Sequence, residues 1–435
     1  MQDAGPAPIR VPPAPERRRI AIVGSGISGL LAAHLLHARH DITLFEKEDR
    51  LGGHTNTIEF ERWGRRLAVD TGFIVCNRRN YPIFTGLLDE LGVQTRPTTM
   101  SFSVRCDRTG FEYGGSSLNA LFAQRRRIAS PRFWRMVRNI LKFGREAPEA
   151  AAACDDSVTL GDFLDASRYS DWFIERYILP MGGAIWSASR ERIRDFPFRA
   201  FVHFFENHGM LLPGDRPQWL TIEGGSQRYV EKLAAPWKDR IRTGAAVKRI
   251  ERDAGGVTIK PAGGDAERFD EVVLAVHSDQ ALRLLADPTE FERMILGAIP
   301  YQSNEAVLHT DASLLPRRKL AWCAWNHHLD DAPGGRVGVT YCMNKLQGVR
   351  SPEPVCVTLN RTERIDPRTI IATIRYDHPV YSRESFEAQR RIGEISGENR
   401  THYCGAWCGY GFHEDGARSA VRVAQELGVG AGAAS

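Results

Sequence analysis

The 435-residue chain lacks the features of a membrane-spanning or metal-binding protein. It has no stretch of about eighteen consecutive apolar residues, so we expect no spanning helix and only peripheral membrane contact, on the inner membrane face. Its eight cysteines form no CxxC pair, which predicts reduced thiols in the cytoplasm and no metal site. Lys and Arg exceed Asp and Glu by only 58 − 53 = 5, so we expect no nucleic-acid partner.

The composition is otherwise that of a globular protein with more than one core. Hydrophobic residues make up 42% of the chain, which is too long for one small domain. Residues 1–16 are rich in proline and contain no apolar run, so we predict a flexible, uncleaved tail there.

Ordered structure is expected to begin with a strand, a tight turn and a helix. Residues 20–23 form a short apolar run, Gly24 to Gly29 follow as GxGxxG, and residues 30–36 are apolar and helical in pattern. Gly24 permits the turn, Gly26 lets the backbone approach a diphosphate, and Gly29 lets the helix pack on the strand. Such a turn in isolation can be structural only, but its context favours a dinucleotide site.

A second strand, residues 41–45, ends at an acid. Glu46 follows Gly26 by twenty positions, where it can accept hydrogen bonds from both hydroxyls of an adenosine ribose. A second glycine pair, Gly52 and Gly53, then brings backbone close to the cofactor again.

These motifs resemble those of the flavin amine oxidoreductase superfamily, the amine oxidase and phytoene desaturase type. Glu46, Arg50, Gly52 and Gly53 match its Glu-x(3)-Arg-x-Gly-Gly segment, although many members have arginine where this chain has His54. The resemblance continues at residues 70–74, 223–226, 242–250, 272–276, 403–407 and 411–417. It implies FAD, with a helix over residues 418–427 whose start faces the flavin. The positions it assigns to the cofactor are Gly24, Ser25, Gly26, Ile27, Ser28, Gly29, Glu46, Lys47, Arg50, Gly52, Gly53, His54, Thr55, Gly72, Phe73, Ile74, Val247, Gly405, His413, Glu414, Asp415, Gly416 and Ala417.

The resemblance also implies the architecture. We expect an α/β fold in which a two-dinucleotide-binding, Rossmann-like FAD domain is built from residues 17–78, 218–283 and 396–430. Residues 79–217 and 284–395 then form an interleaved α+β substrate domain.

One segment of that second domain has a basic amphipathic pattern. Near residues 131–145, six apolar residues share one helical face and the cations Arg135, Arg138, Lys142 and Arg145 share the other, after the cluster Arg125 to Arg127. The pattern fits a helix lying on a membrane, and it fits equally a helix packed on the core with solvated arginines. The aromatic segment of residues 196–212 is similarly ambiguous between a tunnel wall and an ordinary core.

A closer resemblance carries the substrate hypothesis. Residues 70–77 with Tyr81 and Pro82, residues 304–311 and residues 339–347 are similar to a bacterial branch associated with cyclopropane-fatty-acid synthase-type methyltransferases. The branch is implicated in furan fatty acid biosynthesis. This resemblance implies a desaturase or dehydrogenase that acts on methyl-branched or unsaturated fatty acyl chains of lipids by hydride transfer to flavin N5, with a lipid methyltransferase as a partner.

The sequence identifies no catalytic base. Tyr341 and His309 are the candidate catalytic residues by chemistry, and His277, His327 and His413 are further candidates. Three other functions stay open: a flavin amine oxidase with Trp407 and Tyr410 as cage walls, a flavin-dependent double-bond isomerase, and a non-catalytic FAD-binding partner of the methyltransferase.

Overall fold

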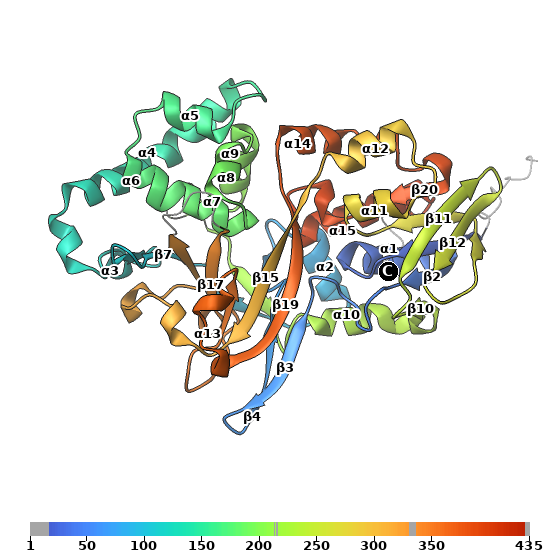
Figure 1. Ribbon diagram of the computed structural model, residues 1–435, viewed down its shortest axis with the longest axis horizontal. Coiled ribbons are helices and arrows are strands. Elements are labelled where there is room, and N and C mark those ends of the chain that lie inside the picture. The colour runs from blue at the N-terminus through green and yellow to red at the C-terminus, as the bar shows by residue number, and fades with distance from the viewer. Residues whose placement is uncertain (1–16, 213, 215, 330–335, 431–435) are drawn as a thin grey trace, which may run out of the picture.

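The computed structural model describes residues 17–212, 214, 216–329 and 336–430 (Figure 1). The predicted tail, residues 1–16, lies outside the described residues. None of the helices in this described part is long and apolar enough to cross a bilayer. All eight cysteines are free.

A five-stranded parallel sheet forms the first core. Its order is β10-β2-β1-β14-β20, with β1 (Arg19–Val23) at the centre. β1 is central because Ile20, Ala21 and Ile22 are apolar and fully buried, as a parallel strand covered on both faces requires. The other strands are β2 (Asp41–Phe45), β10 (Ile241–Arg242), β14 (Glu271–Leu274) and β20 (Thr401–Tyr403). They come from the three chain segments expected for the dinucleotide fold.

Helices cover one face of this sheet. α1 (Ile27–Leu36), α10 (Gln227–Ala234) and α15 (His413–Glu426) bury their apolar faces in one cluster with Ile22 and Val273. The helix expected over residues 418–427 thus starts five residues earlier, at His413. α1 also starts before the predicted apolar stretch, at Ile27.

The opposite face is covered by an antiparallel sheet and by helices. The sheet consists of β11 (Val247–Asp253), β12 (Gly256–Pro261) and β13 (Glu267–Phe269), and the helices are α11 (Ser278–Leu284), α12 (Glu290–Gly297) and α14 (Arg383–Arg390). α12 and α14 lie within the predicted substrate-domain segment 284–395. Ile295, Ala388 and Ile395 nevertheless pack against Ala21 and Val23, because the apolar face that α1 leaves uncovered must be buried.

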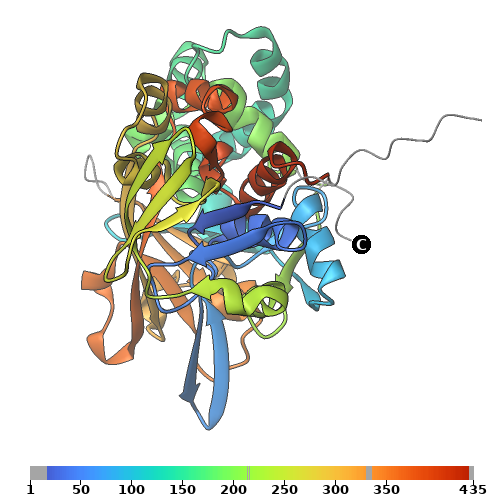
Figure 2. The same cartoon turned by 90° about the vertical axis from the view of Figure 1, so that its right-hand side faces the viewer.

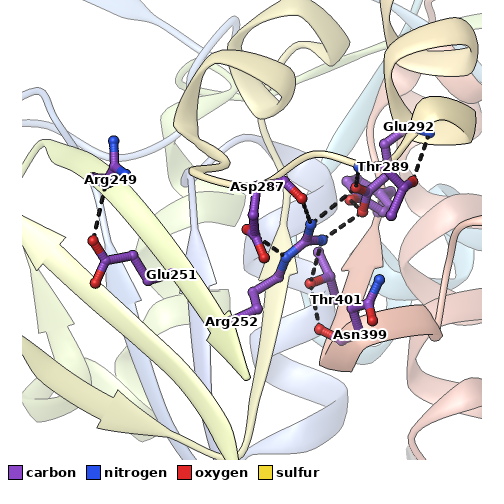
Figure 3. Close-up of polar contacts among 9 residues, drawn as sticks. Arg249, Glu251, Arg252, Asp287, Thr289, Glu292, Asn399 and Thr401 are labelled. Atoms are coloured by element: carbon purple, nitrogen blue, oxygen red, sulfur yellow. Dashed lines mark hydrogen bonds and ion pairs between the residues drawn. The ribbon is translucent and has the colours of Figure 1, made fainter. Parts of the chain in front are cut away.

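A buried ion pair ties this layer together (Figure 3). Arg252 of β11 pairs with Glu292 of α12 at 2.5 Å, and both side chains are 2% exposed. Tyr403 of β20 donates its hydroxyl to the same carboxylate at 2.5 Å. Arg249 and Glu251, on the same strand, form an exposed pair instead.

A seven-stranded sheet forms the second core, in the order β19-β15-β18-β17-β16-β7-β8. Only β16 and β7 pair in parallel. The strands are β7 (Phe102–Cys106), β8 (Phe111–Gly114), β15 (Tyr301–His309), β16 (Trp325–Leu329), β17 (Gly338–Cys342), β18 (Cys356–Leu359) and β19 (Ile370–Pro379). Smaller units are the protruding hairpin of β3 (Thr57–Arg62) and β4 (Arg65–Asp70), and a sheet of β5 (Cys76–Asn77), β9 (Trp219–Ile222) and β6 (Thr95–Thr98) (Figure 2).

A helical cluster completes the second region. It contains α3 (Leu118–Leu121), α4 (Pro131–Ala153), α5 (Leu160–Ala166), α6 (Asp171–Phe173), α7 (Leu179–Trp186), α8 (Arg190–Arg194) and α9 (Phe198–Asn207), while α2 (Pro82–Glu90) packs against α15. In the predicted amphipathic segment, Phe133, Met136 and Phe143 of α4 are buried in this cluster. Most of the aromatic side chains of residues 196–212 are core as well, and only Phe204, Met210 and their neighbours at 208 and 209 reach the cavity described next.

Candidate functional site

One cavity of about 1350 Å³ runs from the carboxyl ends of β1, β2 and β14 into the second region. Ligands bind at this edge of parallel α/β sheets. The volume exceeds the roughly 300–1,000 Å³ of a typical small-molecule pocket, so it accommodates a large cofactor together with a substrate. The two ends of the cavity differ in chemistry.

The sheet end of the cavity is an anion-binding cradle. Gly26 is the N-cap of α1 and no side chain caps the helix, so the first N–H groups are free to face an anion. A Cβ on Gly26 would meet no atom within 4 Å, because it would point into the cavity. Gly29 is the opposite case: its Cβ would lie 1.9 Å from the Gly24 carbonyl oxygen, so that glycine is needed for packing alone.

Glu46 and Arg50 each stabilise one of the two glycine loops. The Glu46 carboxylate accepts hydrogen bonds from the Ser25 N–H at 2.9 Å and from the Ser25 hydroxyl. The Arg50 guanidinium donates to the carbonyls of Gly53 (2.9 Å) and Thr55 (3.2 Å). Both residues also line the cavity, so they position the loops and border the cofactor space.

Three neutral histidines line the same end beside Gly53. The His54 ring lies 5.4 Å from that of His378 and 6.3 Å from that of His277, and it stacks on Tyr376 at 4.9 Å. Burial lowers the pKa of all three, that of His378 to about 4. They therefore offer N–H groups and no positive charge at neutral pH.

The start of α15 closes the cradle from the other side. Gly411, Phe412 and His413 line the cavity, and His413 stacks on Phe73 with ring centroids 3.6 Å apart. The His413 Nε2 lies 3.0 Å from the hydroxyls of Thr55 and Tyr229, and burial lowers the pKa of His413 to about 3. A second helix N-terminus thus faces the cavity, and the Asp415 carboxylate accepts the Phe412 N–H there, as in a capping box.

Most positions expected to contact the cofactor line the cavity. They are Gly24, Ser25, Gly26, Ile27, Ser28, Glu46, Lys47, Arg50, Gly52, Gly53, His54, Gly72, Phe73, Ile74, Val247, Gly405 and His413. Six expected positions lie behind the lining: Gly29, Thr55, Glu414, Asp415, Gly416 and Ala417.

The two acids among those six have structural partners. The Glu414 carboxylate accepts the N–H groups of Ile83 and Phe84 at 3.0 Å each, which caps α2. The Asp415 carboxylate accepts those of Tyr410 and Phe412 at 3.0 Å each. Their side chains therefore build the helix start and do not touch the cavity.

The far end of the cavity, which we call the distal chamber, is mainly apolar. Its described lining residues come from segments 98–116, 177–187, 204–219 and 325–346, and none of these described residues is Asp or Glu. The π-helical turn Ile174–Ile178 brings Tyr177 to its wall, and such turns are frequent at functional sites. The large side chains of its walls include Phe102, Tyr113, Met181, Ile185, Trp186, Trp325 and Tyr341.

Two cations border the distal chamber where it opens to solvent. Arg216 and Lys345 are exposed lining residues, and neither forms an ion pair or side-chain hydrogen bond with any residue that the structure describes. Thr99, Gly115, Ser116 and Gln218 are the other exposed residues of this mouth.

The two candidate catalytic residues separate in space. Tyr341 lines the distal chamber, with its ring edge-on to Trp325 at 5.1 Å. Burial raises the pKa of Tyr341 above its usual value, so the hydroxyl keeps its proton and can donate but not abstract. His309 is fully buried and does not line the cavity.

The prediction for His309 is therefore wrong, for a physical reason. Its Nε2 bonds the Thr358 hydroxyl at 2.7 Å, and its Nδ1 accepts the Asp311 N–H at 3.0 Å. Thr358 in turn bonds Thr340, so this histidine belongs to a polar ladder across the seven-stranded sheet. His327 is also buried away from the cavity, whereas His277 and His413 line its cradle end.

Sequence reasoning missed one histidine of the distal chamber. His208, the residue after α9, lines the chamber and its Nδ1 donates to the Phe204 carbonyl at 2.8 Å. The Nε2 is then the unprotonated nitrogen. Burial lowers the pKa of His208 to about 4, so the ring is neutral at pH 7.

Comparison with known proteins decides the family. The family profile of flavin-containing amine oxidoreductases matches residues 27–358, most of the chain and both ends of the cavity. The chain belongs to this family. FAD is the family's cofactor, and the cradle fits it: two helix N-termini face the cavity, the first of them uncapped, and a bare glycine borders the diphosphate space.

Individual relatives of this flavin-containing family are distant. A protein named as a flavin-containing monoamine oxidase, AofH of Mycobacterium tuberculosis, is 26% identical over 281 residues, which are 62% of this chain and 59% of AofH. An L-amino acid dehydrogenase of Synechocystis is 22% identical over 259 residues. The chain thus spans less than two thirds of the length of AofH.

Solved structures share the fold over nearly the whole chain. A CLA-producing fatty acid isomerase from P. acnes superimposes with a TM-score of 0.69 at 18% identity, covering 94% of this chain and 98% of the isomerase. Putrescine oxidase superimposes with a TM-score of 0.66 at 17% identity, covering 95% and 99%. The mixed α/β fold expected from the sequence is confirmed.

Proposed function

We propose that the protein is an FAD-dependent oxidoreductase that desaturates methyl-branched or unsaturated fatty acyl chains of lipids. The observation that carries the proposal is the distal chamber: its described walls are mainly apolar and include no carboxylate, and its mouth is bordered by Arg216 and Lys345. A hydrocarbon chain is stabilised by the walls, and an anionic headgroup or carboxylate is attracted by the mouth. The fatty acid isomerase shares this fold and is named for an acyl substrate.

A protonated amine is a poorer match for the same chamber. Among the residues with described positions, the carboxylates that line the cavity are Glu46, Glu48 and Asp377, and all three come from segments that contribute to the cradle end. The two mouth cations would repel an ammonium group. The amine oxidase alternative keeps one supporting observation, since Trp407 and Tyr410 both line the cavity.

The division of chemistry follows from the groups present. FAD, when bound, takes up a hydride from the substrate. The second hydrogen of the new double bond leaves as a proton, and the Nε2 of His208 is the unprotonated nitrogen that the distal chamber offers to accept it. Tyr341 offers a neutral O–H to orient the substrate, and the apolar walls exclude water.

The first experiment follows flavin bleaching anaerobically in the purified protein. Phospholipids with methyl-branched or unsaturated acyl chains are compared with benzylamine and putrescine. Bleaching by lipid supports the desaturase, and bleaching by amine alone overturns it in favour of an amine oxidase. A shifted double bond in recovered lipid without net bleaching identifies an isomerase. Bound FAD without reaction, together with a faster methyltransferase in its presence, identifies a non-catalytic partner.

The mouth cations give a prediction about substrate charge. The double variant Arg216→Glu/Lys345→Glu is expected to raise the KM for an anionic phospholipid about tenfold or more, because two attractive charges become repulsive. The KM for a zwitterionic phospholipid should change much less. Lys248→Glu/Arg293→Glu, which alters exposed residues away from the cavity lining, is the matched control. Equal changes for both lipids would contradict the role of the mouth.

His208 gives a prediction about pH. His208→Gln is expected to slow flavin reduction by lipid about 100-fold, the usual effect of losing a general base. Because burial lowers the pKa of His208 to about 4, the neutral form is present above that pH, and the wild-type reduction rate should fall only as the pH approaches 4.

His203→Gln is the matched control for His208, because His203 is an exposed histidine of α9 that does not line the cavity. Tyr341→Phe should lower the rate of flavin reduction less, by about tenfold, and should leave the shape of its pH profile unchanged at acidic pH. A rate for His208→Gln equal to that of His203→Gln would remove His208 from the reaction.

A further inference from the structure

The backbone at the left edge of Figure 1, opposite the parallel sheet, forms a ridge. Its exposed side chains include apolar and basic ones. It is made of α3, the 3-10 turn Arg125–Ala129 and the first half of α4, and we call residues 116–145 the basic ridge. Leu118, Ile128 and Trp134 are 76%, 52% and 42% exposed. Large apolar side chains rarely stand this far into solvent in a cluster without a partner.

The charge of the ridge has one sign. No Asp or Glu occurs from Tyr113 to Arg145, a stretch that contains seven arginines and one lysine. Two of these cations are already engaged: Arg127 lies over Phe111 and Trp172, and Lys142 pairs with Glu146 and covers Tyr169.

The other cations divide by whether they have a partner. Arg125 bonds the Phe122 carbonyl. The remaining five are exposed and form neither an ion pair nor a hydrogen bond with any described residue: Arg126, Arg132, Arg135, Arg138 and Arg145. The ridge therefore has cations that are free to meet an anionic surface.

The ridge adjoins the mouth of the distal chamber. Gly115 and Ser116 are exposed and line the chamber, and Leu118 follows two residues later. Ser117 connects them by capping α3, where its hydroxyl accepts the Ala120 N–H at 3.1 Å. If Leu118 lies in a lipid layer, the chamber opening at Ser116 is only two residues away along the backbone. An acyl chain that leaves the lipid layer there would therefore be next to the opening.

We propose that the basic ridge docks on the surface of an anionic lipid bilayer, with Leu118, Ile128 and Trp134 in the headgroup region and the free arginines against the lipid phosphates. The proposal rests on the proposed function, since it provides the route by which acyl chains enter at Gly115 and Ser116. Exposed apolar residues among arginines match a bilayer interface. A nucleic-acid duplex buries leucine or isoleucine only where its bases are unstacked, which costs a few kcal/mol per step, so it matches exposed apolar side chains less well.

α4 would contact the bilayer with its basic side, whereas a free amphipathic helix inserts its apolar face. Phe133, Met136 and Phe143 are committed to the core, so α4 cannot bury that face in lipid. The interfacial residues are instead those at the start of the ridge and on the outward face of α4.

The test is vesicle flotation of the full-length protein. Vesicles contain either phosphatidylcholine alone or phosphatidylcholine with 30% phosphatidylglycerol, on the order of a natural anionic fraction. Wild type is expected to float only with the anionic vesicles. The variant with Arg126, Arg132, Arg135 and Arg138 each changed to Glu should bind anionic vesicles at least about tenfold more weakly. Each basic residue near the membrane contributes to the binding free energy. The matched control changes four exposed cations elsewhere to Glu: Arg65, Lys248, Arg293 and Arg350.

A second variant separates insertion from charge. Leu118→Ser/Ile128→Ser keeps every arginine and is expected to weaken anionic-vesicle binding several-fold. Equal binding by the ridge variants, the control and wild type overturns the proposal, as does wild-type binding to a DNA duplex in the absence of vesicle binding. Flavin bleaching by lipid dispersed in detergent should be unchanged in the ridge variants. If the protein binds vesicles but no lipid bleaches the flavin, the proposed desaturase function is wrong and the proposed docking surface is supported.

Discussion

Gly26→Glu is expected to weaken FAD binding about a thousandfold while leaving the fold intact. Gly26 has φ −65°, which any residue adopts, and a Cβ there would meet no atom within 4 Å. The new carboxylate would enter the space that the uncapped start of α1 offers to the diphosphate. A charge repulsion at 4 Å with an effective dielectric constant of 20 costs about 4 kcal/mol, so the Kd for FAD should rise about a thousandfold.

Fluorescence titration of apoprotein with FAD measures this effect. Gly86→Glu is the matched control, because Gly86 is an exposed helix residue whose Cβ would also meet nothing. Gly29→Ala should behave oppositely to Gly26→Glu: its Cβ would lie 1.9 Å from the Gly24 carbonyl oxygen, so the apoprotein itself should unfold at a lower temperature. FAD affinity in Gly26→Glu equal to that of Gly86→Glu would place the diphosphate elsewhere.

The dinucleotide fold is predictable from sequence where the signal is local. The apolar runs at residues 20–23 and 41–45 identify β1 and β2, and the glycine turn between them identifies α1. The start of α15 was not predictable in the same way. Its first turn, residues 413–416, has no apolar period and ends in Gly416, which packing against Ile27 and Ser28 requires, since its Cβ would lie 2.8 Å from each.

The distal chamber was beyond sequence reasoning for a different reason. Its walls come from four separate segments that meet only through long-range packing, and a residue such as Met181 or Trp325 has no local signal for a cavity. His208 follows a helix whose aromatic residues are typical of a core, and the orientation of its ring depends on one hydrogen bond to the Phe204 carbonyl. His309 shows the converse, because its hydrogen-bond partner is Thr358 of β18, which is three strands later in the chain but adjacent in the sheet.

For residues 131–145, too, tertiary packing decides what the sequence pattern leaves open. The periodicity of the sequence correctly indicates an amphipathic helix, yet the apolar face that it identifies is in the core. Leu141, assigned by periodicity to that face, is 38% exposed. Tertiary neighbours such as Trp172, which lies under Arg127, decide which arginines are free. A helical wheel of residues 131–145 cannot show such neighbours.

The predicted boundaries of the FAD domain, residues 17–78, 218–283 and 396–430, remain a prediction. The five parallel strands do fall within these segments. α12 and α14 pack against the parallel sheet from outside them, so a boundary drawn by sequence motif and one drawn by packing differ.

Arg252→Met is expected to cause the largest loss of stability of any single change considered for this fold. The variant leaves Glu292 buried without its cation, which typically costs about 3–5 kcal/mol. At pH 7.5 the thermal midpoint of unfolding should fall by at least about 5 °C. Arg249→Met on the same strand removes only the exposed pair with Glu251, so it should change stability by about 1 kcal/mol or less (Figure 3).

The loss caused by Arg252→Met should depend on pH in a direction fixed by Glu292. In the wild type, burial raises the pKa of Glu292, but the hydrogen bonds from Arg252 and Tyr403 outweigh it and leave that pKa below its usual value. Ionised Glu292 therefore stabilises the wild type above the unfolded pKa, and this contribution is lost as the pH falls. Without Arg252, burial dominates and the pKa rises, so the variant should take up a proton on folding at mildly acidic pH. The difference in unfolding free energy between wild type and variant should then shrink between pH 7.5 and pH 4.5, and the double variant Arg252→Met/Glu292→Gln should recover stability at pH 7.5. A difference that stays constant with pH would mean that Arg252 stabilises the layer by packing alone.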